Sequence, residues 1–384
     1  MFAYDLRITN AILSYDFEEW RKGRQPGLTC FTWATCEPQT LRDPRLPSLR
    51  ATQPLVAAAM LCLLWSLFQA AAVIVTLLVL ALFVLILRSD ADHLTVFWER
   101  FGAKAEILGG KVVWITGASS GIGEHLAYQL TQVGCKVIIS ARREDQLNKV
   151  KDACLASAKC RTKAEDILVL PLDVSQYDTH KDAVQTVLDK FDHIDILINN
   201  AGRGMRGKWW EVDFKVDREM WELNVLGPVS LTHCVLPHMM KRRQGHIVAV
   251  SSIAGLFPAA RTRSYTGAKH AVQGYFGILR HEMFEYNIDV TLLCPGPIHS
   301  EFTTVQLTSS GKPLGRDTAL KRMSTERCAY LSCVAIANRM FESWISENPA
   351  LLLVYFYQWF PTLFKWILGP RIVKMMIQKE GGDY

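Results

Sequence analysis

The stretch from Leu55 to Leu87 contains no charged residue, no glycine and no proline, and its most polar side chain is Gln69. A helix needs roughly 20 apolar residues to cross a bilayer, whereas the apolar core of a signal peptide has only about 7–15. The run lies well inside the chain and lacks the turn residues of a hairpin. We therefore expect one uncleaved, tilted membrane-spanning helix, with Ser66–Leu87 as its membrane portion. The alternative is a core helix of a globular domain.

The two flanks of this anchor, residues 55–87, lead to different expectations. Residues 1–54 mix aromatic, charged and proline residues without a period, which is typical of a poorly ordered tail. Residues 88–107 are predicted to form a linker, with a short helix as the alternative. Arginines lie on both sides of the anchor in numbers too similar for the positive-inside rule, so the membrane side of the following domain stays open. A single-pass membrane protein with an N-terminal anchor is predicted.

Beyond the anchor, apolar runs of strand length alternate with longer helix-like segments. Hydrophobic residues make up 49% of the chain, which is enough for a full core. Regular alternation of strands and helices is typical of a parallel sheet covered on both faces. We predict an α/β Rossmann fold, a doubly wound parallel sheet, in a single domain over residues 108–340. The six expected strands are Lys111–Thr116, Lys136–Ser140, Ile167–Pro171, Ile194–Asn199, His246–Ser251 and Asp289–Leu293.

Charge and cysteine spacing exclude several classes of function. The chain has 43 Lys and Arg residues against 37 Asp and Glu, and the formal charge of +6 is spread without a basic run long enough to follow a nucleic acid. Its 10 cysteines form no CxxC pair and lie scattered. We therefore expect no nucleic-acid partner, no metal site and no disulfide scaffold.

The first expected strand runs directly into TGASSGIG, residues 116–123, and an amphipathic helix-like segment follows. Gly117 permits a tight turn, Gly121 lets the backbone approach a pyrophosphate, and Gly123 allows close packing. The N-terminus of the following helix presents N–H groups to the anion. This pattern predicts a dinucleotide-binding turn, although a glycine triplet alone is weak evidence.

The second expected strand ends in SARRE, where an acidic residue would bind the 2′-hydroxyl of NAD. Arg142 and Arg143 stand there instead, and guanidinium groups pair with a 2′-phosphate. We therefore predict NADP(H); the alternative is two solvated arginines. Asp173, at the end of the third strand, is a candidate to accept from the adenine amine, and a turn residue is an equally good account of it.

Three residues further along carry a pattern suited to proton transfer. Ser252 closes the fifth expected strand, and Tyr265 and Lys269 stand four apart in YTGAK, on one face of a helix. A free phenol has a pKa of about 10, and a nearby ammonium favours its ionised form. The pair is therefore suited to exchanging a proton near neutral pH.

In combination, TGASSGIG, NNAG at 199–202, Asn224 in NVLG, YTGAK and CPGP at 294–297 resemble the short-chain dehydrogenase/reductase family over about residues 110–300. The resemblance implies that Tyr265 is the general acid or base and that Lys269 lowers its pKa and holds the nicotinamide ribose. It also implies that Ser252 hydrogen-bonds the substrate carbonyl and that Asn224 organises a relay water. The implied cofactor residues are Gly117, Ser119, Ser120, Gly121, Ile122, Gly123, Arg142, Arg143, Asp173, Asn200, Ala201, Gly202, Tyr265, Lys269, Pro295, Gly296, Ile298 and Ser300.

In this family the substrate is bounded by variable segments, here 203–210 and about 301–324, and no charged clamp is evident in them. Residues 341–384 form an aromatic C-terminal extension, which suits a membrane interface, with core packing or a dimer contact as alternatives. An interfacial entrance would favour lipophilic carbonyl or alcohol substrates such as retinoids, steroids or xenobiotics. Family analogy suggests the endoplasmic reticulum and a homodimer built on helices around Trp221 and Tyr265.

The sequence therefore predicts a membrane-anchored, NADPH-dependent carbonyl reductase. Two alternatives stay open. The first is an NAD-dependent alcohol or steroid dehydrogenase, whose acidic residue at the position of Ala141 or Arg142 is missing. The second is a non-catalytic cofactor-binding scaffold, which would be expected to lack Tyr265, Lys269 or Ser252; all three are present.

Overall fold

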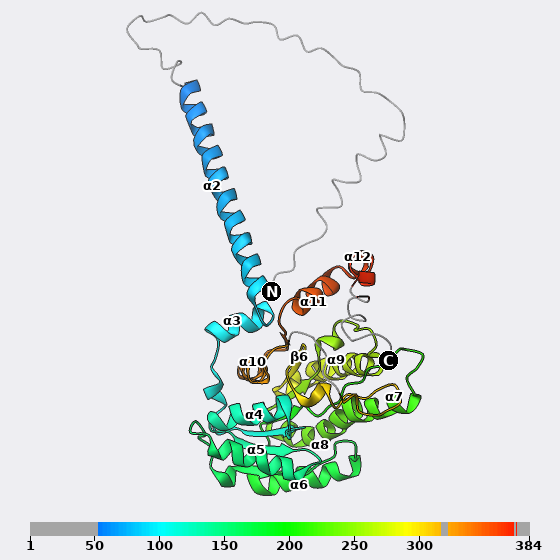
Figure 1. Cartoon of the computed structure of the whole chain (residues 1–384). Helices are drawn as coiled ribbons and strands as arrows, with labels where there is room; N and C mark the ends of the chain where they lie inside the picture. The colour runs from blue at the N-terminus through cyan, green and yellow to red at the C-terminus, as the bar shows by residue number, and fades with distance from the viewer. Residues whose placement is uncertain (1–52, 316–321, 372–373, 375–384) are drawn as a thin grey trace, which may run out of the picture. The chain divides into compact units, whose positions relative to one another are not determined.

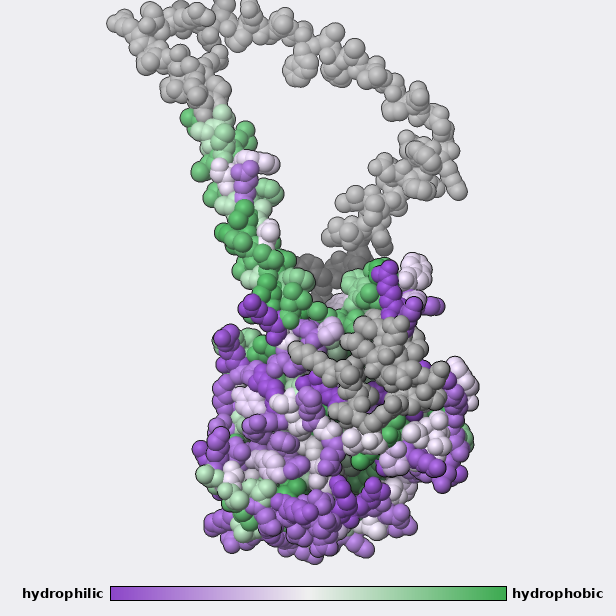
Figure 2. All heavy atoms as spheres, in the orientation of Figure 1, coloured by the Kyte–Doolittle hydropathy of each residue, from purple (hydrophilic) through white to green (hydrophobic). Residues whose placement is uncertain are grey.

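A computed structural model describes residues 53–315, 322–371 and 374. The expected poorly ordered tail lies, apart from its last residues, outside this described part. The chain divides into two compact units, Met1–Ala72 and Val73–Tyr384, and the division falls within helix α2 (Gln53–Arg88). Apolar side chains cover α2 (Figure 2), and the helix is long and apolar enough to cross a membrane over Val56–Arg88.

The second unit is built on a seven-stranded, fully parallel sheet in the order β3-β2-β1-β4-β5-β6-β7. The order reverses direction between β1 and β4, where a doubly wound sheet opens a crevice for ligands. The strands are β1 (Val112–Thr116), β2 (Lys136–Ser140), β3 (Ile167–Val169), β4 (Ile196–Asn199), β5 (Gly245–Val250), β6 (Ile288–Pro295) and β7 (Glu342–Ile345).

Helices cover both faces of the sheet (Figure 1). Alternate side chains of β1 enter different cores: Val113 and Ile115 pack with α4, α5 and α10, whereas Trp114 packs with α6, α8 and α9. The α-helices of this unit beyond α2 are α3 (His93–Phe101), α4 (Gly121–Gln132), α5 (Glu144–Ala156), α6 (His180–Phe191), α7 (Phe214–Trp221), α8 (Gly227–Arg242), α9 (Arg263–Met283), α10 (Thr325–Ala337), α11 (Ala350–Trp359) and α12 (Pro361–Ile367). Short 3₁₀ or π turns are η1 (Ala105–Leu108), η2 (Ala164–Asp166), η3 (Tyr177–Thr179), η4 (Glu222–Leu226), η5 (Ile253–Gly255), η6 (Phe284–Tyr286) and η7 (Glu301–Thr303).

The prediction of a parallel Rossmann sheet is confirmed, and each of the six expected strands has its counterpart among β1–β6. The sequence missed β7, so the sheet continues past residue 340, where we expected the domain to end. The strand is short, its burial alternates, and it forms the edge of the sheet beside β6. A four-residue edge strand carries too weak an apolar pattern to stand out from the sequence.

Residues 88–107, expected to form a linker, contain α3 and pack firmly on the edge of the sheet. The Asp92 N–H donates to the Trp344 carbonyl at 2.8 Å, and the Trp344 N–H donates to Asp92 Oδ2 at 2.7 Å. Arg327 of α10 forms ion pairs with Asp90 and Glu99. This segment therefore covers the open edge of β7, which would otherwise be free to pair with another chain.

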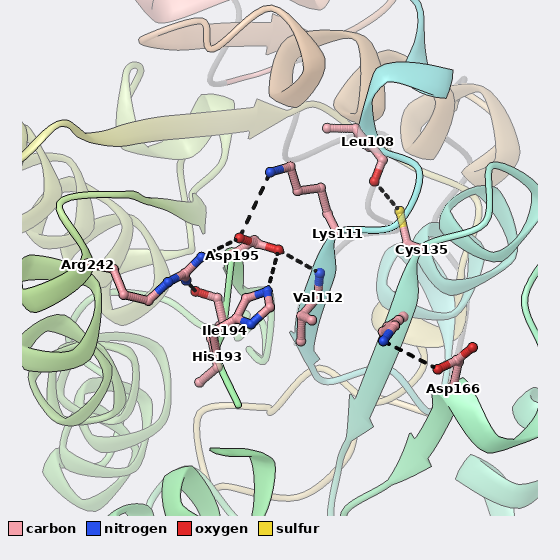
Figure 3. A network of polar contacts seen from close by, with 10 residues as sticks. Leu108, Lys111, Val112, Cys135, Asp166, His193, Ile194, Asp195 and Arg242 are labelled. Carbon is pink, nitrogen blue, oxygen red and sulfur yellow. Dashed lines mark hydrogen bonds and ion pairs between the residues drawn. The ribbon is translucent and has the colours of Figure 1, made fainter. Parts of the chain in front are cut away.

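At the amino ends of the strands, a polar network centres on Asp195, which is 6% exposed (Figure 3). Its carboxylate accepts from the Val112 N–H and from Arg242, both at 3.0 Å, and lies 3.2 Å from His193 Nε2 and 4.0 Å from Lys111 Nζ. Its backbone also bonds β1 and β5. Asp195 thus holds the central strands together at the edge away from the crevice.

The C-terminal helices bury one face and expose the other. Val354 and Phe364 pack against Phe257 in a small apolar cluster of their own. Trp359 and Trp366 are 73% and 74% exposed. The aromatic extension therefore combines a packed face with large apolar side chains that the described residues leave uncovered.

Candidate active site

A cavity of about 680 Å³ lies at the carboxyl ends of the strands. The residues predicted for the cofactor line it, with the exception of Gly123, and the catalytic candidates Ser252, Tyr265 and Lys269 are among the lining residues. The structure therefore brings together, in one cavity, residues from the ends of the six strands β1–β6 and from α9.

The turn between β1 and α4 is shaped by its glycines. Gly117 and Gly121 have φ angles of +67° and +61°, in the left-handed region that favours glycine. A Cβ on Gly123 would lie 2.4 Å from the Gly117 carbonyl oxygen, so this position tolerates no side chain. Asn200 Nδ2 donates to the carbonyls of Thr116 and Gly117 at 2.9 and 3.1 Å. NNAG thus fixes the turn from the neighbouring strand.

Arg142 and Arg143 follow β2 as exposed side chains on the cavity wall. Arg143 donates to Ser119 Oγ, which lies 3.5 Å from Nη2, and so reaches the glycine turn. Asp173 also lines the cavity, and its Oδ1 accepts from the N–H and hydroxyl of Ser175 at 3.0 and 2.7 Å. The structure therefore shows the turn role of Asp173 and leaves its contact with adenine a prediction.

The loop after β6 forms the opposite side of the cavity. Ile298 is buried and pairs with Met323, whereas Ser300 caps the start of η7 and accepts from the Phe302 N–H at 3.4 Å. A Cβ on Gly121 would lie 3.3 Å from the Cβ of Ser300. The loop and the glycine turn thus approach each other closely across the cavity.

Tyr265 and Lys269 lie one turn apart on α9, beside Ser252 at the end of β5. Lys269 Nζ lies 5.8 Å from the centre of the Tyr265 ring and donates to the Val250 carbonyl at 2.7 Å. Ser252 Oγ donates to the Pro295 carbonyl at 3.2 Å. The three side chains can therefore act on one small group in the cavity.

Burial shifts the pKa values of both members of the pair toward their neutral forms. Loss of water raises the pKa of the Tyr265 phenol to about 12, although Ser252 and the charge of Arg206 lower it. The same loss of water lowers the pKa of the Lys269 ammonium to about 8. At neutral pH the site therefore holds a protonated phenol beside a cation.

Asn224 lies in η4, a single π-helical turn that joins α7 to α8. Its Oδ1 accepts from the Arg203 N–H at 3.0 Å, and its Nδ2 donates to the carbonyls of Arg203 and Met220 at 3.1 and 3.0 Å. The side chain is 1% exposed and braces the backbone after β4. Its role toward a relay water stays a prediction.

Comparison with known proteins assigns this arrangement to a family. The family described as short chain dehydrogenase matches residues 111–310. The human protein named dehydrogenase/reductase SDR family member 7 is 43% identical over 328 residues, which cover 84% of this chain and 94% of that protein. The chain belongs to the short-chain dehydrogenase family. Mouse dehydrogenase/reductase SDR family member 7B is similar at 34% identity, covering 72% of this chain and 85% of that protein.

Solved structures of dehydrogenases share the fold. A short-chain dehydrogenase/reductase from Burkholderia phymatum, in complex with NAD, is 25% identical, with a TM-score of 0.58 over 67% of this chain and 95% of that one. An alcohol dehydrogenase from Thermococcus sibiricus, complexed with 5-hydroxy-NADP, has a TM-score of 0.54 over 62% of this chain and 97% of that one at 23% identity. Membership of this family supports an oxidoreductase that binds a nicotinamide nucleotide.

In this short-chain dehydrogenase, two basic residues of the segment 203–210, Arg203 and Arg206, line the cavity, and Arg206 Nε donates to Gln306 at 3.1 Å. The sequence predicted a role for this segment but for neither of the two side chains, although both closely follow NNAG. Phe257 and Leu353, also on the wall, come from segments whose approach to the cavity no local pattern reveals.

Proposed function

We propose that this protein is a membrane-anchored, NADPH-dependent reductase of carbonyl groups on lipophilic molecules, with Tyr265 as the proton donor. The observation that carries the proposal is the convergence of Ser252, Tyr265 and Lys269 on a cavity that also contains a glycine turn. Reduction of a carbonyl needs a hydride, a proton for the developing alkoxide, and donors that stabilise its charge.

The cavity fits a dinucleotide. At Gly117 and Gly123 an added Cβ would lie 2.7 Å or less from backbone or Asn200 atoms, and at Gly121 it would narrow the cavity toward Ser300. The helix α4 begins at Gly121, so its first N–H groups would be available to bind the pyrophosphate. Arg142 and Arg143 would hold a 2′-phosphate. When bound, the cofactor supplies the hydride.

The remaining chemistry belongs to the chain's own residues. Ser252 would donate to the substrate carbonyl oxygen and so stabilise the charge that develops there. Burial raises the pKa of Tyr265 to about 12, so the phenol is protonated at neutral pH. It would donate this proton to the substrate oxygen. Lys269 places a positive charge 5.8 Å from the ring centre and would stabilise the phenolate that remains.

Apolar side chains in the lining of the cavity support a lipophilic substrate. Phe257, Phe302, Val305 and Leu353 lie on its wall, and the Phe302 ring centre lies 5.8 Å from that of Tyr265. Arg206 adds one cation to this mainly apolar group. A hydrophobic ketone or aldehyde would therefore gain more from the wall than a small polar one.

The C-terminal helices support contact with the lipid surface. Asn348 donates to the carbonyls of Ile86 and Leu87, both at 2.9 Å, so α11 begins beside the end of the apolar helix α2. Trp359 and Trp366 expose the amphipathic rings that are enriched where membranes meet water. From the family resemblance we also propose the endoplasmic reticulum as the membrane, and a homodimer through the helices around Trp221 and Tyr265.

The test of the catalytic proposal is NADPH oxidation by the full chain in detergent with retinal, ketosteroids and small aromatic dicarbonyls, beside the variant Tyr265→Phe. We expect turnover of the lipophilic carbonyls, and a loss of about 100-fold or more in the variant because general acid catalysis is worth that much. Full turnover by Tyr265→Phe would overturn the mechanism. A tenfold preference for small polar carbonyls would overturn the substrate class.

The test of the lipid contact is quenching of tryptophan fluorescence by brominated lipids in vesicles that carry the full chain. The double variant Trp359→Phe and Trp366→Phe should lose quenched signal. The matched control is Trp209→Phe with Trp210→Phe, because these side chains are as exposed, at 70% and 78%, and lie far along the chain from α11. Equal losses in both double variants would contradict the assignment.

A further inference from the structure

Arg203 is a basic residue that the sequence did not single out for the cofactor. It follows NNAG after β4, and its side chain lines the main cavity together with Arg142 and Asp173. The same three residues also border a second hollow beside α7. Arg203 therefore lies in the same part of the main cavity as Arg142.

The position of Arg203 is fixed at its backbone and at its side chain. Its N–H and carbonyl both bond the Asn224 amide, at 3.0 and 3.1 Å. Its Nε donates to the Val305 carbonyl at 2.8 Å, in the loop after β6. A guanidinium has five N–H donors in a planar fork, so this bond leaves donors for a second, oxygen-bearing group.

Two like charges converge at this place. Burial, and then the positive charge of Arg142, lower the pKa of the Arg203 guanidinium, and Glu219 of α7 offsets part of this effect. Arg142 comes from the end of β2 and Arg203 from the end of β4. Two guanidinium groups brought together from different strands repel each other, and an anion between them would turn this repulsion into attraction.

We propose that Arg203 and Arg142 hold the 2′-phosphate of NADP(H) from two sides, which makes Arg203 a determinant of NADPH over NADH. The inference rests on the proposed NADPH dependence and adds a residue from a different strand to it. Because Arg203 also bonds Val305, an occupied phosphate site would steady the loop that forms the substrate side of the cavity. Arg203 acts here on cofactor choice and touches no reacting atom.

The test is direct binding to the full chain in detergent, with NADPH and NADH followed by fluorescence, and with 2′,5′-ADP and 5′-AMP as competitors. Arg203→Gln should weaken binding of NADPH and of 2′,5′-ADP by about 10–100-fold, the range for losing a charge-assisted hydrogen bond. NADH and 5′-AMP should bind as before, which also shows that the variant is folded. The control is Arg218→Gln, an exposed cation beside the second hollow that does not line the main cavity.

The outcomes separate this inference from the proposed function. Wild-type protein that binds NADH at least as tightly as NADPH would overturn the proposed cofactor. Wild-type preference for NADPH that survives in Arg203→Gln, while Arg142→Gln abolishes it, would overturn the role of Arg203 alone. Equal weakening of NADPH and NADH in Arg203→Gln would also overturn it, because the residue would then support the fold of the site and not the 2′-phosphate.

Discussion

A buried charged side chain lies at each end of the central sheet, and the two differ in their hydrogen-bond partners. At the amino ends, Asp195 is 6% exposed and receives bonds from the Val112 N–H and from Arg242. At the carboxyl ends, Lys269 is 5% exposed, and the hydrogen bond described for its ammonium goes to one neutral carbonyl, that of Val250. Both side chains are almost inaccessible to water, and the hydrogen-bond partners of the two charges differ.

The pKa values record this difference. Burial acts to raise the pKa of Asp195, but the hydrogen bonds from the Val112 N–H and Arg242, together with the charges of Lys111 and His193, outweigh it, and the pKa is lowered. For Lys269 burial dominates and lowers the pKa to about 8. A buried charge that its neighbours stabilise adds to the stability of the folded state. A buried charge without such neighbours lowers that stability, and reactive sites often contain one. Asp195 therefore stabilises the fold at the amino ends of the strands, whereas Lys269 provides a reactive group at their carboxyl ends.

The largest effect is expected from Lys269→Met, which removes the charge and keeps an unbranched apolar side chain. Carbonyl reduction should fall by about 100-fold or more, because the phenolate of Tyr265 loses its neighbouring cation. Thermal stability should be unchanged or higher, since a desolvated ammonium is no longer buried. NADPH oxidation and thermal unfolding of the same preparation measure both. A variant that is active but unstable would reverse the assignment of Lys269.

Asp195→Ala should produce the opposite pattern. The variant leaves the Val112 N–H without its side-chain acceptor, which costs about 1–3 kcal/mol of unfolding free energy, and it removes the ion pair with the partly exposed Arg242 as well. The NADPH affinity of the folded fraction should stay within a few-fold of wild type. Urea unfolding and NADPH titration measure the two quantities. The control is Asp166→Ala, because Asp166 forms a more exposed pair with Lys136 at 3.9 Å. If this variant lost as much unfolding free energy as Asp195→Ala, the burial of Asp195 would have no special effect on stability.

The two charges also predict separate pH windows of stability. The pKa of Asp195 is lowered on folding, so its contribution is present above the unfolded carboxyl value of about 4 and is lost as pH falls through the folded value. The pKa of Lys269 falls from 10.5 to about 8, so at this residue the unfolded chain binds more protons between these values, and the Lys269 contribution to stability rises with pH there. The difference in unfolding free energy between wild type and Lys269→Met, measured across pH, tests this. A difference that does not change between pH 8 and 10.5 would contradict it.

Local patterns sufficed for the core strands and the cofactor turn. A strand buried on both faces needs an apolar run, and the turn after β1 needs glycine at Gly117, Gly121 and Gly123, so both leave a mark within a few residues. The pairing of Tyr265 with Lys269 follows from helical spacing in the same way. These are features in which the deciding contacts lie within one element or one connection.

Other features depend on contacts between distant parts of the chain. The edge strand β7 is held in part by Asp92, which lies far from it in sequence. The charged wall after NNAG depends on Asn224 and Val305, which fix Arg203 from two other elements. No local period or spacing encodes such contacts, so the sequence missed the seventh strand and placed Arg203 only within the segment 203–210, without a contact of its own.

The smallest expected effect is the difference in unfolding free energy between variants of two partners of Asp195, Lys111 and Arg242. Lys111 reaches it at 4.0 Å with a side chain that is 39% exposed, whereas Arg242 approaches at 3.0 Å and also donates to the Ile194 carbonyl. Lys111→Met should therefore change the unfolding free energy by less than about 1 kcal/mol, the range of exposed pairs, and Arg242→Met should cost more. Urea unfolding of both variants at low and high salt gives the comparison. Equal losses would mean that the net positive charge around Asp195, and not the geometry of its hydrogen bonds, stabilises this end of the sheet. Asp195 would then differ from Lys269 only because charges of opposite sign surround it, and not because it has more hydrogen bonds.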